Sequence, residues 1–600
     1  MKKIFKAALS LPVLMLVSCE SMDIKPNSQG NSETWYSTEQ ELQMAANRFY
    51  TIGYWNSPYQ DTEQWTDNFT YRTTNRHPDN GAPLNGNLTG EDYIVYHMWE
   101  QAYKLIAQAN LLLTHSGRAK ANGVSEDVVN RYRAEAYFAR ACKYAELISY
   151  FGDVPYVDKP LTIAESEVLK RMPKDQLIPK VYDDFDHAID SLPVSYDKLK
   201  RFTKGAAMAM KARFALYMGD WKTAAEAAEA CIGLDIYDLD SSYEHLFLQT
   251  TKENPEKILF FPRSVALGVK LDDWFVNNQL PRLVGGYGAS NPSWDLLASY
   301  LCTDGLPIDE SELFEPKDPF KNRDPRCSMT IVPFGSEHVG YLYEPYSPTA
   351  HRANGEAAGN NPDCRFSADP NAVHCSYNGL LWKKGIDDSW LLPSGQKNLD
   401  NETDFVMMRY ADVLLMYAEA KIELGEADQE ILDETINKVR ARAYGNGTYP
   451  RVLASDQKTM RKALRIERRM EFANENLRYM DLIRWRLSST FENSQVDKYD
   501  PLNSPNYIFP EADKLEDIVT GDRWFWDDVV PDIDENGIPD LSPLETAGLA
   551  QTGAPRVFPK RQILWPIPTH DGLLNPALGQ NDGYTGENTG TVVEDDETNS

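Results

Sequence analysis

The chain has 600 residues, with 61 Lys and Arg against 90 Asp and Glu, which gives a formal net charge of −29 at pH 7. A negative charge of this size keeps a surface protein in solution and argues against nucleic acid or an anionic membrane face as a partner. The 32 Tyr and 13 Trp include side chains on which a ligand can stack, although many of them will lie in the core.

The N-terminus has the form of an export signal. Three lysines precede an apolar stretch from Ala7 to Val17, which is shorter than the roughly 20 residues that a membrane-spanning helix needs. The stretch runs into Cys19, which is the pattern of a bacterial lipoprotein signal. We expect residues 1–18 to be removed, leaving a formal charge of −32, and Cys19 to carry acyl chains that anchor the protein to a membrane. The alternative is an ordinary secretory signal in which Cys19 is incidental.

Helical periodicity recurs along much of the chain. Apolar side chains recur on one helical face from Arg133 to Tyr150, and the following Gly-Asp-Val-Pro sequence ends that helix. Ala-rich helical hairpins with Gly turns cover Lys204–Leu234 and Tyr410–Ala443, and such hairpins are typical of tetratricopeptide repeats. Further helices are predicted over Glu39–Tyr50, Tyr93–Ser116, Lys174–Ser191, Lys458–Asn474 and Leu477–Trp485.

Long segments with little periodicity separate these helices. They cover Asn56–Gly90, Gln249–Asp404 and Glu492–Pro559, and loops of this length are usually functional or disordered. The acidic tail 586–600 is predicted to be disordered. The predicted fold class is therefore mainly α, with a tetratricopeptide-like helical-hairpin scaffold and long irregular insertions.

Two irregular segments combine aromatic rings with polar side chains, as sugar binding requires. The first holds Trp65, Asp67, Asn68, Tyr71 and Arg72. The second runs from Trp274 to Tyr287, next to glycines that give an open backbone. We predict that at least one of these rings contacts a ligand, while the alternative for each is that it holds its loop on the scaffold. Trp294 precedes an apolar helical run and is predicted to be core, whereas Trp382 and Trp390 are further candidates.

Six cysteines remain after Cys19. Cys142 and Cys231 lie in Ala-rich helices and are predicted to be small buried residues. Cys364 and Cys375 flank a short loop and are the candidate disulfide pair in an exported chain.

Glu467 and Glu471 are the carboxylates that could suggest an enzyme. They are four residues apart on a predicted helix, and a retaining glycosidase uses two carboxyl groups about 5 Å apart. Arginines surround them, however, and keep carboxylates ionised and paired rather than ready for acid catalysis. A scaffold role is therefore favoured over catalysis.

An acidic stretch near the C-terminus supplies oxygen atoms at alternate positions. Asp532, Asp534, Asn536 and Asp540 follow the order of a calcium loop. The twelfth position is Pro543, so the usual bidentate Glu is missing. Calcium bound by these four side chains is a side hypothesis, and the alternative is an acidic loop with Asx turns. No other cofactor is predicted.

Four stretches in a fixed order carry a family resemblance. They are Arg133–Pro155, which ends in Phe-Gly-Asp-Val-Pro; Arg409–Ala420 with Ile436–Ala443; Ile466–Trp485; and Trp565-Pro-Ile-Pro568 with Asn575-Pro576 and the sequence Gln-Asn-Asp-Gly-Tyr that ends at Tyr584. With the lipoprotein cysteine, they resemble the SusD/RagB family of outer-membrane nutrient-binding lipoproteins over nearly the whole chain. Asp571 stands where the family usually has Glu, and Lys421-Ile422 replaces the usual Leu-Asn; neither departure puts the family in doubt.

The resemblance implies how the chain is divided. It implies four tetratricopeptide-like helical pairs and a variable, loop-rich half that holds the ligand site. We expect a signal peptide (1–18), an anchor and tether (19–34), one SusD-like domain (35–585) and the tail. Within the domain, the scaffold is expected over 35–55, 91–248 and 405–490, and the loop-rich parts over 56–90, 249–404 and 491–560.

The resemblance also implies a function. It implies a non-enzymatic receptor at the outer membrane, facing the cell exterior, that captures an oligosaccharide and passes it to a TonB-dependent transporter of the SusC type. The alternatives are a peptide receptor of the same family, a glycoside hydrolase, and a purely structural lid whose loops bind only the transporter. Neither the glycan nor its linkage follows from the residues.

Overall fold

The computed structural model describes residues 34–55, 62–71, 83–197, 200–316, 318–344, 364–366, 378–496, 498–503, 508–509, 529–548, 551–552 and 556–584. The predicted signal peptide, Cys19, the tether up to residue 33, Arg72, Cys375 and the tail 586–600 lie outside these residues. Within the described part of the chain, every helix is too short or too polar to cross a bilayer.

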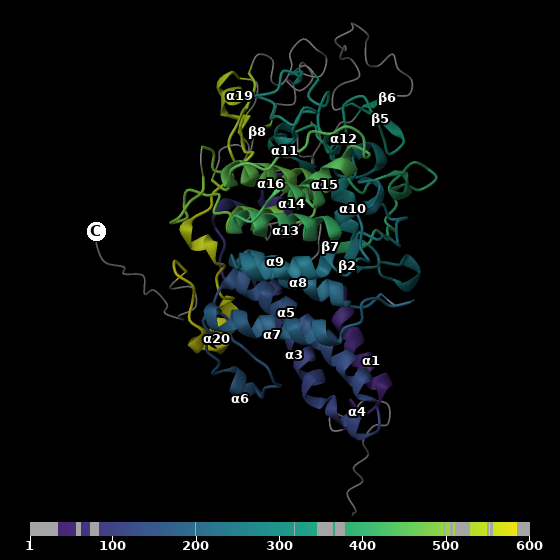
Figure 1. The fold of residues 1–600 in the computed structure, drawn as a ribbon, viewed down its shortest axis with the longest axis vertical. Coiled ribbons are helices and arrows are strands. Elements are labelled where there is room, and N and C mark those ends of the chain that lie inside the picture. Colours follow the sequence, from purple (N-terminus) through teal and green to yellow (C-terminus); the bar gives the residue numbers. More distant parts are fainter. Residues whose placement is uncertain are drawn as a thin grey trace, which may run out of the picture.

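A stack of helices forms the lower and middle parts of the molecule (Figure 1). Along this stack α3 packs on α5, α5 on α7, α7 on α8, α8 on α9, α9 on α13 and α13 on α16. Its helices are α1 (Glu39–Asn47), α3 (Tyr93–His115), α4 (Gly117–Ala121), α5 (Glu126–Phe151), α6 (Ile163–Ser166), α7 (Lys174–Ser191), α8 (Lys204–Met218), α9 (Trp221–Ile232), α13 (Tyr410–Leu424), α14 (Gln429–Glu434), α15 (Ile436–Ala443), α16 (Gln457–Phe472) and α17 (Arg478–Arg484). The predicted mainly α, helical-hairpin scaffold is confirmed.

The hairpin of α8 and α9 shows why these sequences pack as they do. Small side chains from both helices, such as Ala209 and Ala228, are fully buried between neighbours and let the helix axes come close. Gly219 ends α8 with a φ of 73°, a left-handed conformation that favours glycine. The Asp220 side chain then accepts a hydrogen bond from the Thr223 backbone N–H at 3.1 Å and caps α9.

Most predicted helix bounds agree with the structure within two residues, and three differ. Helix α1 ends at Asn47, and the last three residues of the predicted helix Glu39–Tyr50 form a 3-10 helix. Helix α5 begins at Glu126 instead of Arg133, because buried Val129 and Tyr132 continue its apolar face towards the N-terminus. The second helix of the predicted hairpin Tyr410–Ala443 is broken at Thr435, whose φ of −122° and ψ of −93° separate α14 from α15.

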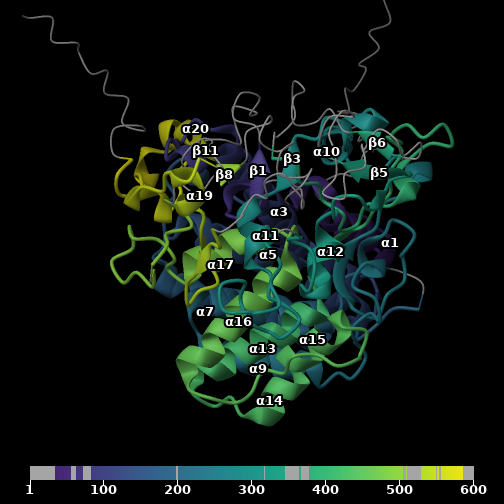
Figure 2. The ribbon, with the colours of Figure 1, turned by 90° about the horizontal axis from the view of Figure 1, so that it is seen from above.

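The loop-rich half gathers at the other end of the stack, where α10, α11 and α12 lie (Figures 1 and 2). It is built from short helices and small sheets rather than one large sheet. The remaining α-helices are α10 (Asp273–Gln279), α11 (Trp294–Ser299), α12 (Pro325–Thr330), α19 (Ser542–Thr546) and α20 (Thr569–Leu574). Short 3-10 helices cover Arg48–Tyr50, Ile52–Tyr54, Glu63–Trp65, His245–Phe247, Val265–Leu267, Arg282–Val284, Asp388–Trp390, Lys560–Ile563 and Pro576–Leu578.

The strands pair mostly as antiparallel two-stranded ribbons. These are β1 (Phe69–Tyr71) with β3 (Ser290–Pro292), β2 (Lys257–Phe261) with β7 (Phe405–Arg409), β8 (Ile508–Phe509) with β11 (Gln551–Thr552), and β9 (Asp532–Ile533) with β10 (Pro539–Asp540). A three-stranded sheet joins β4 (Glu337–His338), β5 (Tyr341–Glu344) and β6 (Cys364–Phe366), with β5 and β6 parallel. In register, Phe69 lies opposite Pro292, so the first irregular segment is tied to the second.

Helix α16 joins the two halves. Leu464 and Phe472 belong to the apolar core of the helical stack, whereas Ile466 and Met470 on the same helix belong to the core of the loop-rich half. A helix that is apolar on two faces must be buried on both. The two halves therefore share an element and cannot separate without exposing it.

The C-terminal segment from residue 556 runs back along the helical stack (Figure 1). Trp565 is buried against Tyr150 and Phe151 at the end of α5. The Asn581 side-chain amide donates to the backbone carbonyls of Phe151 at 3.0 Å and Trp565 at 2.7 Å. The first and the last of the four sequence stretches thus meet in space.

Four of the described cysteines are buried free thiols. Cys142 and Cys231 are buried as predicted, and Cys302 and Cys327 are buried in the loop-rich half. Cys364 lies in β6, but Cys375 is outside the described residues, so their disulfide stays a prediction.

Candidate ligand-binding site

The first predicted site, around Trp65, is part of the core. Trp65 is only 1% exposed, and its ring packs against Tyr479 and Trp565 with centroid distances of 5.4 and 5.2 Å. A buried ring offers no face to a sugar. The prediction that Trp65 stacks on a ligand is therefore wrong, and its alternative, a ring that holds the loop on the scaffold, is confirmed.

Asp67 and Asn68 are buried as well, because arginines on α16 and α17 bind their side chains. Arg478 donates to both Asp67 carboxylate oxygens at 2.9 and 2.8 Å, and Arg469 lies 3.0 Å from the same carboxylate. Asn68 accepts from Arg469 at 2.9 Å and donates to Glu63 at 2.9 Å. Burial alone would raise the pKa of Asp67, but the two guanidinium groups outweigh it and hold that pKa well below its usual range. The ligand role predicted for both residues is wrong.

Tyr71 and Arg72 complete the first predicted segment. Tyr71 is the last residue of β1 and lies opposite Ser290 of β3. The structure describes its backbone only, and Arg72 lies outside the described residues. Their ligand contacts stay predictions.

The second predicted site places an exposed aromatic ring in the loop-rich half. Trp274 lies in the first turn of α10 and is 44% exposed. The half-buried Tyr287 ring lies beside it, with a centroid distance of 5.7 Å and an interplanar angle of 64°. We call this pair of rings the Trp274–Tyr287 platform. An edge-to-face pair leaves one ring face open, which is the surface that a sugar ring needs.

Local sequence fixes the position of both rings. The Asp272 carboxylate accepts from the backbone N–H groups of Trp274 and Phe275 at 2.9 and 3.1 Å, and so starts α10. At the other end, Tyr287 N–H donates to Asn277 C=O at 2.6 Å. Gly286 makes this approach possible, because a Cβ atom there would lie 2.0 Å from the Leu280 carbonyl oxygen. The loop therefore folds back onto α10 and sets Tyr287 beside Trp274.

A lysine from a distant loop completes the platform. The Lys397 ammonium lies 5.4 Å from the centre of the Tyr287 ring, donates to Gly285 C=O at 2.6 Å and binds the Asn277 side-chain oxygen. These contacts join the loop to α10. No sequence signal pointed to Lys397 or Asn277, since the lysine lies over a hundred residues from the rings.

The remaining tryptophan predictions divide clearly. Trp294 is fully buried, and its indole N–H donates to Asn378 C=O at 2.9 Å, so the core assignment is confirmed. Trp382 and Trp390 are also buried and belong to the same core, which excludes the ligand contact considered for them.

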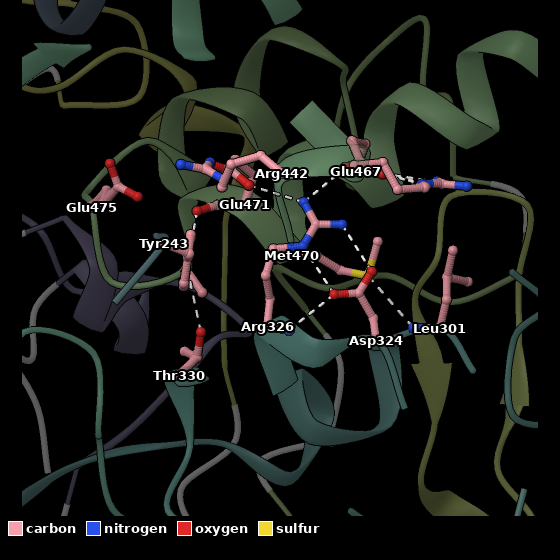
Figure 3. Close-up of polar contacts among 12 residues, drawn as sticks. Tyr243, Leu301, Asp324, Arg326, Thr330, Arg442, Glu467, Met470, Glu471 and Glu475 are labelled. Atoms are coloured by element: carbon pink, nitrogen blue, oxygen red, sulfur yellow. Dashed lines mark hydrogen bonds and ion pairs between the residues drawn. The ribbon is translucent and has the colours of Figure 1, made fainter. Parts of the chain in front are cut away.

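Glu467 and Glu471 lie in a buried network of arginines (Figure 3). Arg326 donates to Glu467 at 2.7 Å and to Glu471 at 2.9 Å. Arg409 also donates to Glu471 at 2.7 Å. Further partners are Asp324 on Arg326, Arg440 on Glu467, and Arg442 on Glu471.

This network is a structural junction. Both carboxylates have no exposed surface, so a substrate cannot reach them. Burial raises the pKa of Glu471, but Arg442, Arg409 and Arg326 outweigh it and hold that pKa well below its usual range. A glycosidase acid needs the opposite shift. The scaffold interpretation of this pair is confirmed, and the hydrolase alternative loses its candidate carboxylates.

The predicted calcium loop forms the β9–β10 turn and uses its oxygens internally. Asp534 accepts from the backbone N–H groups of Asn536 and Ile538 at 2.8 and 2.9 Å. The side-chain oxygens of Asn536 and Asp532 accept from Arg465 and Lys498, and Asp540 accepts from the Ser542 backbone N–H at 2.9 Å. Two of the four side chains thus face cations, and the described residues contain no cluster of acidic, His or Cys side chains that could hold a metal. The calcium hypothesis is wrong, and the Asx-turn alternative is confirmed.

Comparison with known proteins relates this architecture to one family. The model of the SusD family matches residues 270–584, and a second model, described as starch-binding associating with outer membrane, matches residues 20–216. SusD-like protein P2 of Formosa agariphila is 26% identical over 508 residues, which cover 82% of this chain and 92% of the relative. A SusD-like protein of Bacteroides ovatus is 22% identical over 521 residues, covering 80% and 81%.

Solved structures show the same fold. A SusD-like carbohydrate binding protein from Bacteroides fragilis matches with a TM-score of 0.73 at 25% identity, covering 91% of this chain and all of that one. A laminarin binding SusD-like protein matches with a TM-score of 0.61 at 18% identity, covering 92% and 100%. Because the SusD family model spans more than half of the chain, the protein belongs to the SusD family.

Proposed function

We propose that this SusD-family protein is a non-enzymatic, lipid-anchored receptor on the outer face of the outer membrane. It binds an oligosaccharide at the Trp274–Tyr287 platform and passes it to a TonB-dependent transporter of the SusC type. The observation that carries the proposal is the exposure of Trp274, because the other tryptophans singled out in the sequence are buried in the two cores.

The chemistry of the platform suits a sugar. The C–H face of a pyranose packs on an indole or phenol ring, while hydroxyl groups take hydrogen bonds from nearby polar atoms. Trp274 supplies the open ring, and Asn277 and Lys397 are polar groups next to Tyr287. A shallow site with few fixed polar groups gives weak binding, on the order of micromolar to millimolar, or roughly −8 to −4 kcal/mol.

The relatives support a glycan as the ligand class. One solved relative is named as a carbohydrate binding protein and another as laminarin binding, and one matching family model is described as starch-binding. The description of that model also names association with the outer membrane, which fits an anchor at Cys19. A receptor of this kind needs a partner that moves the captured glycan across the membrane. The family resemblance implies that this partner is a transporter of the SusC type.

Calorimetry on the full chain in detergent tests the proposal. The titrants are oligosaccharides of plant, microbial and host origin, with peptides as a second panel. We expect heat from one glycan class, at least tenfold weaker binding in Trp274→Ala, and unchanged binding in Tyr93→Ala. Tyr93 is the matched control, because it is a 55% exposed aromatic residue at the start of α3 in the helical stack. Binding of peptides alone, or of no ligand from either panel, would refute the glycan receptor.

A further inference from the structure

The hairpin from Leu391 to Lys397, which we call the 391–397 hairpin, borders the Trp274–Tyr287 platform. Its two end residues form an antiparallel bridge. At its tip, Leu392 N–H donates to Gln396 C=O at 2.7 Å, and Gly395 N–H donates to Leu392 C=O at 2.8 Å. Gly395 has a φ of 77°, a left-handed conformation that favours glycine. These bonds fix the backbone on both sides of the turn, including that of Gln396.

The 391–397 hairpin is fastened to the loop that carries Tyr287. The Lys397 backbone N–H donates to Val284 C=O at 2.8 Å, and its ammonium donates to Gly285 C=O at 2.6 Å. The Gln396 side-chain oxygen lies 3.0 Å from the position that a Cβ atom on Gly285 would take. Since Gly285 precedes Tyr287 by two residues, the Gln396 amide lies at the edge of the platform.

The polar side chains nearest the two rings already have partners. The Asn277 amide donates to Asp273 C=O at 2.7 Å, and its oxygen accepts from Lys397. The Lys270 ammonium lies 3.0 Å from the Asp273 carboxylate. By contrast, the side-chain amide of the exposed Gln396 has no hydrogen-bond partner among the described residues. An amide can donate to and accept from a hydroxyl group, so Gln396 offers unused hydrogen-bonding capacity beside the platform.

The surroundings of Gln396 suit a sugar. Its backbone is already held by Leu392, so binding a ligand would order only the side chain, and a partner positioned in advance costs less to order. Leu392 in the same hairpin is 45% exposed and offers an aliphatic surface to the C–H face of a sugar ring. Apolar surface with a few placed polar groups is the usual composition of a ligand site.

We infer that Gln396 forms a second sugar subsite next to the Trp274–Tyr287 platform. One sugar ring stacks on Trp274, and a neighbouring ring of the same chain exchanges hydroxyl hydrogen bonds with the Gln396 amide. The protein therefore binds an oligosaccharide more tightly than a single sugar. This inference rests on the proposed function, because Gln396 acts on the chain that the platform holds.

Comparing a monosaccharide with a hexasaccharide tests the inference. The probes are glucose and mannose, and the hexasaccharides of the malto-, cello-, laminari- and manno-oligosaccharide series, with the full chain in detergent. Calorimetry measures the hexasaccharides, and saturation-transfer NMR follows the monosaccharides at millimolar concentration. We expect Gln396→Met to weaken binding of the hexasaccharide that gives heat about three- to tenfold, as the loss of one hydrogen bond would. The monosaccharide signal should be unchanged in this variant. Trp274→Ala should weaken the binding of both probes.

Two features of the design separate ligand contact from packing. Methionine keeps the length of the glutamine side chain and its contact with Gly285, so a role in packing alone would survive Gln396→Met. Gln176→Met is the matched control, because Gln176 is an exposed glutamine on α7 in the helical stack. It should leave the binding of both probes unchanged, and thermal unfolding shows whether each variant keeps its fold.

Four results would overturn the inference. Equal hexasaccharide affinity in the natural chain and Gln396→Met, together with a loss in Trp274→Ala, would leave the proposed function standing without a second subsite. Equal losses for both probes in Gln396→Met would place the amide at the first sugar ring. An equal loss in Gln176→Met would show that the effect does not come from the platform. No binding of any glycan would refute the proposed function and this inference together.

Discussion

Two segments with the same kinds of residue have opposite positions in this protein. The segment from Trp65 to Asn68 and the segment from Asp272 to Trp274 each join tryptophan to aspartate in an irregular region. In the first, the ring and all three polar side chains are buried; in the second, the ring is exposed and Asp272 caps a helix. Composition alone therefore does not separate a binding loop from a loop that belongs to the core.

The difference arises from residues far away in the chain. Arg469 and Arg478 come from α16 and α17, some 400 residues after Asp67, and they draw its carboxylate into the interior. A buried carboxylate with two guanidinium partners holds its neighbours in place, and Trp65 is buried with it. At the platform, the Asp272 carboxylate caps its own helix by accepting from the Trp274 N–H, so it is not drawn into the interior and Trp274 stays at the surface.

The largest expected effect is a difference in unfolding free energy between Trp65→Ala and Trp274→Ala. Trp65→Ala removes a ring that is packed against Tyr479 and Trp565, and we expect it to lower the free energy of unfolding by about 3–5 kcal/mol. Trp274→Ala removes an exposed ring, and we expect a change of less than about 1 kcal/mol. Urea unfolding followed by circular dichroism measures both. Equal losses in the two variants would show that the burial contrast does not govern stability.

The second prediction concerns two buried carboxylates whose arginine contacts differ. Asp67 binds Arg469 and Arg478 directly, whereas Asp295 lies 3.8 Å from Arg556 and is deeply buried. Burial raises the pKa of Asp295 to about 7, although Arg556 opposes the shift. The folded state thus keeps this proton to a higher pH than the unfolded chain does, and the stability it contributes at low pH is lost between about pH 4 and pH 7.

Asp295→Asn tests this because asparagine resembles the protonated acid and does not titrate. We expect the variant to equal the natural chain near pH 4 and to be more stable by up to about 4 kcal/mol above pH 7, since the shift of about three pKa units, which already includes the opposing effect of Arg556, corresponds to about 4 kcal/mol. Urea unfolding at several pH values measures the difference. Parallel pH profiles for the two proteins would contradict the assignment of the proton to Asp295.

Much of the fold could be predicted because its signals are local. Helical period, alanine faces and glycine turns gave the bounds of α7, α8, α9 and α13. The break at Thr435 has no such signal, since the surrounding sequence keeps helical spacing. Motif order predicted the family. The first and the last of the four stretches meet in space, as the hydrogen bond from Asn581 to Phe151 shows.

The candidate site could be predicted only in part. The sequence named Trp274 and Tyr287, because these rings stand beside carboxylates and glycines outside helical periodicity. It also named Trp65 and Asp67, since nothing local distinguishes a loop whose aspartate will meet distant arginines. Lys397 was not predicted, because its contact with Tyr287 depends on how two loops pack and leaves no signal in the local sequence. The exposure of a loop side chain is a property of tertiary structure.

The smallest expected effect tests how the platform is held. Lys397→Met keeps the length of the side chain but removes the ammonium that joins Gly285 to Asn277 and lies over Tyr287. We expect oligosaccharide binding to weaken about two- to fivefold, as the loss of one exposed cation–π contact worth roughly 0.5–1 kcal/mol would give. Lys270→Met is the matched control, because Lys270 lies close by in the sequence and pairs with Asp273 and Asp400 instead. Calorimetry with the glycan that binds the natural chain measures both variants. A loss well above tenfold in Lys397→Met would mean that the ammonium contacts the glycan itself, and equal losses in both variants would mean that charge near the platform matters rather than the position of Tyr287.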